Sequence, residues 1–313
     1  MNNETQNNHY VPQHLLRNFA DTGGKIWIYD TELKTQRYGN TKSAGFERKL
    51  YPPEVEKFLT RLVDTPGFEA ITGLLKQTKL NGKQWVNFIG FVATQMQRTP
   101  SCFDRAAAVS DPMFQETAER IARDTKFQND LRKSMEEKGA SPEEIQQFLQ
   151  IIGTGQFKVS SNREFLLKQS LWVVPMLSKV LLKMKWGILQ IPNGEPDLVI
   201  GDHAVMLYDK GPNDIPPAPL GLSNPHIELV MPLSSRAVAV ACWTGENSFG
   251  EIGIGSAKAI NELTFSHARR FIFAPYKSDE LLKRAIELKG TGPKIHSRII
   301  TMGKGLMILT EYR

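Results

Sequence analysis

The sequence has little of what a disulfide-bonded or thiolate-bound protein needs. Only two of its 313 residues are cysteines, Cys102 and Cys242, and no CxxC pair occurs. Two isolated thiols are typical of a reducing compartment and argue against a disulfide framework or a thiolate zinc site. The sequence therefore predicts no metal bound through sulfur.

Long apolar runs are also missing. The polar residues 1–8 lack the apolar core of a signal peptide. The most apolar segment, 171–182, closely follows Lys168, contains Lys179 and is too short to span a bilayer. These absences predict a cytoplasmic protein, bacterial or viral, with no membrane partner.

Several catalytic motifs are missing as well. There is no Walker A loop, no GxSxG elbow and no HExxH pair. The spaced glycines of 250–255 do not form a dinucleotide-binding pattern after a strand. We therefore expect no nucleotide cofactor, and no other cofactor is indicated.

The overall composition is that of a globular protein with a sizeable core. Hydrophobic residues make up 41% of the chain and charged residues 23%. The net charge of +6 favours a nucleic acid or another anionic ligand as partner. The alternative is that this charge only keeps the protein soluble, as it does in many proteins without a polyanion partner.

The order of the expected elements predicts an α+β fold with a helical middle region and a mainly antiparallel C-terminal sheet. We expect residues 1–51 to form a helix and a β-ribbon that belong to a composite core. Residues 54–185 are expected to form a helical subdomain, and residues 186–313 a β-rich region that completes the core.

Local signals predict several boundaries. Asp111-Pro112 is expected to start a helix, and Ser161 with Glu164 a longer helix to about residue 185 that Pro175 kinks or interrupts. Asn193-Gly194 is expected to be a hairpin turn between strands 186–191 and 197–200. Strands 295–301 and 306–312 would form a hairpin across 303–305.

Two helices carry polar groups on an otherwise apolar background. In the first, Pro12 suits the opening turn and Gln13 and Arg17 lie one turn apart. In the second, 83–98, the polar residues Gln95 and Arg98 stand near the C-terminal end. They either line a cavity or only cap the last carbonyls of the helix.

The opening sequence His9-Tyr10-Val11-Pro12-Gln13, followed by Leu16-Arg17-Asn18-Phe19, resembles the signature of an uncharacterised bacterial family, domain of unknown function 4238. The resemblance continues through Tyr29-Asp30, Gln95, Arg98-Thr99-Pro100, Pro232-Leu233, Asn261 and residues 270–275. Members tend to carry Ser-Asp-Asn-Pro where this chain has Gly201-Asp202-His203-Ala204, so only the aspartate is kept. The resemblance implies no established activity.

These segments supply a set of groups suited to a phosphodiester. The candidate catalytic residues are His9, Arg17, Arg98 and Asp202, and the candidate substrate-binding residues are Gln13, Lys42 and Gln95. His9 would move a proton, an arginine would stabilise charge on phosphorus, and Asp202 would orient the imidazole. The amides and Lys42 would hold substrate oxygens.

We therefore predict a metal-independent hydrolase acting on RNA or DNA, in phage defence or as a toxin. One alternative is a non-catalytic module that binds a nucleic acid or nucleotide. Another is a structural network, with His9 capping the first helix and Arg17 paired with Glu47 or Asp202. A zinc site of His9, His14 and Asp202 is weaker, because residues five apart do not share a helix face.

Overall fold

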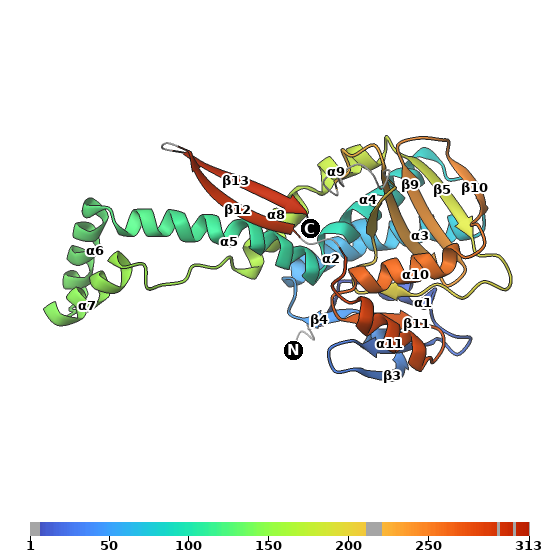
Figure 1. The fold of residues 1–313 in the computed structure, drawn as a ribbon, viewed down its shortest axis with the longest axis horizontal. Coiled ribbons are helices and arrows are strands. Elements are labelled where there is room, and N and C mark those ends of the chain that lie inside the picture. Colours follow the sequence, from blue (N-terminus) through green and yellow to red (C-terminus); the bar gives the residue numbers. More distant parts are fainter. Residues whose placement is uncertain (1–6, 211–220, 293–294, 303–304, 313) are drawn as a thin grey trace. The chain divides into compact units, whose positions relative to one another are not determined.

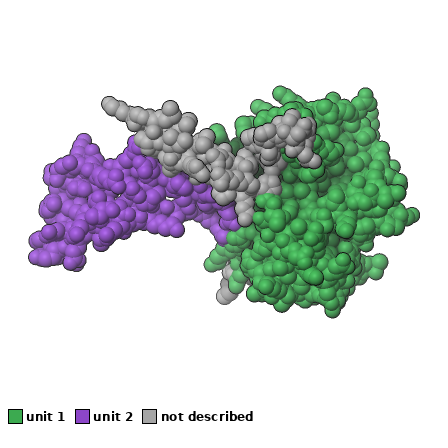
Figure 2. Space-filling model, in the orientation of Figure 1, with its two compact units in different colours: residues 1–103, 167–294, 312–313 green, residues 104–166, 295–311 purple. Residues whose placement is uncertain are grey.

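The computed structural model describes residues 7–210 and 221–292, together with the backbone of 295–302 and 305–312. The fold is α+β, as the sequence predicted. The chain divides into two compact units, one of residues 1–103, 167–294 and 312–313 and the other of residues 104–166 and 295–311 (Figure 2). These boundaries differ from the expected ones, because helices between residues 53 and 97 belong to the same unit as both larger sheets.

The first unit contains a five-stranded sheet in the order β10 (Ser248–Glu251), β5 (Lys185–Gln190), β9 (Ala237–Cys242), β8 (Ile227–Ser234) and β7 (Met206–Asp209) (Figure 1). All pairs are antiparallel except β10 with β5. Trp186 of β5 packs against Phe88 of α4 (Gly82–Gln97), with ring centroids 5.2 Å apart. This aromatic contact joins the helix to the sheet.

A four-stranded antiparallel sheet has the order β3 (Thr35–Asn40), β2 (Lys25–Asp30), β11 (Phe271–Ala274) and β6 (Ile200–Gly201). Helices α10 (Ser256–His267) and α11 (Asp279–Leu288) pack side by side and contribute Phe265, Leu281 and Ala285 to its core (Figure 1). The N-terminal ribbon thus shares a sheet with C-terminal strands.

One long helical stretch changes its winding part-way. It begins as α2 (Pro53–Leu59), continues as the π-helical η2 (Thr60–Asp64) and ends as α3 (Thr65–Leu75). A π turn inserts an extra residue and rotates everything after it, and such turns are frequent at functional sites. Here Leu59 and Asp64 are buried, whereas Phe58 and Leu62, which lie one helical turn apart, are 53% and 51% exposed.

Most of α5 (Pro100–Ala122) belongs to the second unit, with α6 (Thr125–Glu137) and α7 (Pro142–Gly153). Ser141 and Glu144 form the capping box that opens α7. The strands β12 (Ile295–Met302) and β13 (Gly305–Tyr312) form a two-stranded sheet of their own. They do not extend a larger sheet, and residues 303–304 of the expected turn lie outside the described residues.

Three expected boundaries are wrong. Pro112 lies inside α5, because Asp111 does not cap a helix but accepts the backbone N–H of Ser161 at 2.8 Å. Asn162, not Ser161, caps α8 (Arg163–Trp172) by accepting the N–H of Phe165 at 2.8 Å. Near Pro175 a new helix, α9 (Val174–Leu181), begins, as expected.

The third wrong boundary is the hairpin at Asn193-Gly194. Strand β5 pairs with β9 and β10, and the two-residue strand β6 pairs with β11. The side chain of Arg236 occupies the intervening loop and donates to the carbonyls of Ile191 and Pro192 at 2.9 and 2.7 Å.

Among the described residues, no helix combines the length and apolar character needed to cross a membrane.

Candidate functional site

A cavity of about 850 Å³ lies beside the opening motif. One wall comes from β1 (Asn7–His9), α1 (Gln13–Arg17) and η1 (Thr41–Ser43), which contribute Asn7, His9, Gln13 and Lys42. The other comes from α2 and η2. Its lining residues are Glu54, Glu56, Lys57, Phe58, Thr60, Arg61 and Leu62.

Local backbone geometry fixes the first wall. Strand β1 pairs antiparallel with β4 (Phe46–Arg48), which places His9 opposite Phe46. The N–H of Val11 donates to the Gly45 carbonyl at 3.1 Å. Gly45 has φ +61°, and a Cβ there would lie 3.0 Å from the Val11 Cβ. Glycine allows this close approach, which turns the chain from β1 into α1.

His9 is the titratable group at the centre of this wall. Its Nδ1 lies 3.5 Å from Gln13 Nε2, and its ring packs on Phe46 with centroids 5.6 Å apart. An amide nitrogen only donates, so in this arrangement Nδ1 accepts and the neutral ring carries its proton on Nε2. The Nε2 atom is buried without a hydrogen bond of good geometry to any described residue.

The environment favours the neutral ring. Burial lowers the pKa of His9 below its ordinary value of 6.5, and the nearby Arg98 charge lowers it further. The Lys42 carbonyl and Asp64 oppose this shift. At pH 7 His9 is therefore a neutral imidazole whose basic nitrogen is Nδ1.

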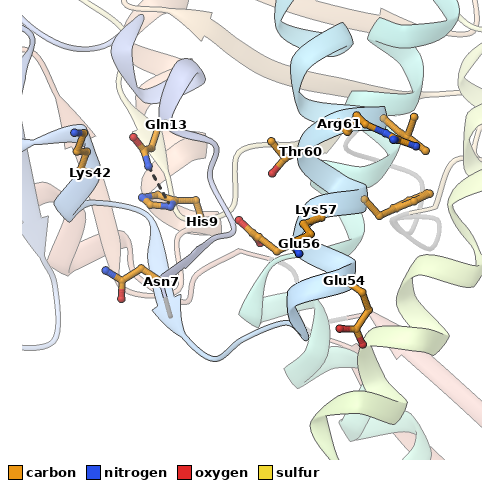
Figure 3. A pocket seen from close by; sticks show the side chains of 11 residues that line it. Asn7, His9, Gln13, Lys42, Glu54, Glu56, Lys57, Thr60 and Arg61 are labelled. Carbon is orange, nitrogen blue, oxygen red and sulfur yellow. Dashed lines mark hydrogen bonds between the residues drawn. The ribbon is translucent and has the colours of Figure 1, made fainter. Parts of the chain in front are cut away.

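Glu56 faces this imidazole across the cavity. In Figure 3 the side chains of Glu56 and Thr60 point from the helix toward His9, whereas Arg61 lies on the opposite side of the helix. Burial raises the pKa of Glu56 above 4.5, against the lowering effects of Arg98 and of a hydrogen bond from Asn8, at 3.3 Å. Burial thus brings the His9 and Glu56 pKa values closer together.

Arg98 is a predicted catalytic residue that does not line this cavity. It is 1% exposed, and its Nη1 donates to both oxygens of Asp64 at 2.8 and 3.1 Å. Its Nε donates to the Tyr10 carbonyl at 3.1 Å. With its amide oxygen turned toward Arg98, Gln95 accepts from Nε at 2.8 Å and from Nη2 at 2.6 Å. Arg98 and Gln95 thus form a buried network behind the wall.

Asp202 is also engaged elsewhere. Its carboxylate accepts the backbone N–H groups of Arg269, Arg270 and Phe271 at 2.7, 2.7 and 2.9 Å. Burial raises the pKa of Asp202, and these three hydrogen bonds act in the opposite direction. The carboxylate therefore fixes the entry to β11 and does not orient His9.

Arg17 stands in the last turn of α1, exposed, and is not among the residues that line the cavity. The cavity therefore brings together only some of the residues that the sequence analysis placed in one site. The cavity brings His9, Gln13 and Lys42 together, while Arg17, Arg98, Asp202 and Gln95 lie outside its lining. Helix α1 has no side-chain cap, so His9 does not cap it.

No sequence signal pointed to Glu56, Lys57 or Thr60, because the apolar spacing of this helix singled out only its hydrophobic residues. A second polar cluster was also missed. His203 Nδ1 lies 3.2 Å from both Thr99 Oγ1 and Ser101 Oγ, and its ring stacks on His267 with the ring centroids 6.5 Å apart.

Within the described part of the chain, no three His, Cys, Asp or Glu side chains are grouped to hold a metal ion.

The family of this chain follows from a match that covers most of its sequence. A family model described as protein of unknown function (DUF4238) matches residues 7–278. The chain belongs to this family. In this DUF4238 protein, the opening motif supplies the cavity through His9 and Gln13 and the buried network through the Tyr10 carbonyl. No curated protein and no solved structure matches the chain.

Proposed function

We propose that this DUF4238 protein hydrolyses a phosphodiester of RNA or DNA in the cavity beside His9, without using a metal ion. The observation that carries the proposal is the pair of opposed titratable groups: a neutral His9, restrained through Nδ1 by only a 3.5 Å contact, and a Glu56 whose pKa is raised. Such a pair matches the base and the acid that phosphoryl transfer needs.

In the proposed reaction, Nδ1 of His9 takes a proton from the attacking water or ribose hydroxyl as the new P–O bond forms. Glu56, in the protonated form that its raised pKa favours, gives its proton to the leaving oxygen as the old P–O bond breaks. The exposed ammonium groups of Lys42 and Lys57 line the same cavity and would neutralise the phosphate. Gln13 would then donate to a substrate oxygen.

The second candidate is a binding module for an anionic ligand. Two observations favour it: Glu56 already accepts a hydrogen bond from Asn8, and Arg98 is engaged by Asp64 and by the Tyr10 carbonyl outside the cavity lining. In that case the cavity would hold a phosphate through its lysines and perform no chemistry. Binding would weaken steeply with salt.

The test is incubation of purified protein with end-labelled RNA and DNA, with and without EDTA. The proposal predicts cleavage that persists in EDTA and falls by about 10²- to 10⁴-fold in His9→Ala. His226→Ala is the matched control, because His226 is exposed and lies outside the cavity lining. Salt-sensitive binding without cleavage would support the binding module, and cleavage retained by His9→Ala would overturn the proposal.

A further inference from the structure

An exposed apolar stripe runs along α8 and α9, away from the cavity lining. Trp172 is 82% exposed, Met176 60% and Leu182 40%. Trp172 is the last residue of α8, Met176 follows four residues later in the first turn of α9, and Leu182 directly follows the last residue of α9. We call these three residues the tryptophan stripe.

The stripe lies in a segment that carries positive charge alone. No aspartate or glutamate occurs between Glu164 and Glu195. Lys179, Lys183 and Lys185 are exposed, and none of them forms an ion pair with a described residue. The segment therefore combines large apolar side chains with ammonium groups that no carboxylate neutralises locally.

The buried side of this segment packs against the rest of the same unit. Leu181 is buried, and its carbonyl accepts the indole N–H of Trp186 at 3.0 Å. Helix α9 packs along α4. The stripe is thus not needed to anchor the helix, and its exposure is unfavourable unless another surface covers it.

We infer that the tryptophan stripe attaches the protein to an anionic lipid bilayer. Tryptophan and other apolar side chains insert at the level of the lipid headgroups, and adjacent lysines attract anionic lipids. The charge complementarity favours this partner, because the unneutralised Lys179, Lys183 and Lys185 lie close to the stripe in the sequence and all three are exposed. This inference departs from the expectation of no membrane partner, which rested on the lack of a spanning segment, because attachment to a surface needs no such segment.

The experiment is cosedimentation of the full chain with vesicles of phosphatidylcholine alone or mixed with phosphatidylglycerol. We expect binding only to the mixed vesicles, loss of binding in high salt, and a blue shift of tryptophan emission on binding. Trp172→Ala and the double variant Lys179→Glu/Lys183→Glu should each weaken binding on the order of tenfold. Lys126→Glu/Lys133→Glu, which changes two exposed lysines of α6 by the same charge, should leave it unchanged.

Absence of vesicle binding would overturn the inference, as would equal binding by the wild type and by the stripe variants. A concentration-dependent dimer that Trp172→Ala dissociates, with no vesicle binding, would show that a second copy of the chain covers the stripe. Because Trp172 is so exposed, its variant should retain the melting temperature of the wild type. A failure to fold therefore does not explain a loss of binding.

Discussion

Arg98 and Asp64 form a buried ion pair in which Nη1 of Arg98 donates to both carboxylate oxygens, at 2.8 and 3.1 Å. The pair joins the end of α4 to the π-helical segment η2. Arg98 also donates to the Tyr10 carbonyl at 3.1 Å, so it connects the two cavity walls without lining the cavity itself.

Removing one member of this pair should destabilise the protein strongly, because the other charge stays buried. We expect Arg98→Ala to lower the free energy of unfolding by about 3–5 kcal/mol, measured by urea denaturation. Arg120→Ala, which breaks the exposed Arg120–Glu116 pair of 2.9 Å, should cost less than about 1 kcal/mol. Equal losses in the two variants would contradict this account of the network.

The contact between α3 and α4 depends on the missing side chain of Gly67. A Cβ at this position would lie 2.6 Å from the Phe91 Cβ, whereas a Cβ at Gly90 of α4 would meet nothing within 4 Å. Gly67→Ala should therefore destabilise the protein by about 1–3 kcal/mol. Gly90→Ala should stabilise it by up to about 1 kcal/mol through helix propensity. Thermal denaturation of both variants measures the difference, and the same sign for both would refute it.

Lowering the pH should reduce the stability of the folded protein, because His9 is buried in its neutral form. Since its folded pKa lies below 6.5, the unfolded chain takes up a proton first as the pH falls. The stability contribution is therefore intact above pH 6.5 and is lost as the pH falls through the folded pKa. Between pH 7.5 and pH 5, the wild type should therefore lose more stability than His9→Gln, as measured by urea denaturation at each pH. Parallel stability curves for the two proteins would argue against a buried, neutral His9.

The sequence predicted those helices and strands whose signals lie within a few neighbouring residues. The capping box at Ser141, the strand 25–30 with its partner around residue 38, and the amphipathic helix 83–98 need only neighbouring residues to be recognised. The opening motif also led to the cavity, because Pro12 and Gln13 fix the start of α1 next to His9.

The sequence did not predict which side chains pair with each other over long distances in the chain. The partner of Arg98 is Asp64, which lies in a segment of ordinary helical pattern and turns toward Arg98 across the π-helical insertion in η2. Nothing local distinguishes this carboxylate from its neighbours. For the same reason Asp202 looked like an acid–base group, although three backbone N–H groups from residues 269–271 occupy it.

The most direct test of the central proposal, that His9 is the base and Glu56 the acid, is cleavage of an oligonucleotide whose leaving oxygen is replaced by sulfur. A thiolate leaves without protonation, so the sulfur substrate does not need the acid. We predict that Glu56→Gln slows cleavage of the oxygen substrate by about 10²-fold or more, yet cleaves the sulfur substrate at nearly the wild-type rate, while His9→Ala is slow on both. Equal slowing of both substrates by Glu56→Gln would contradict the account.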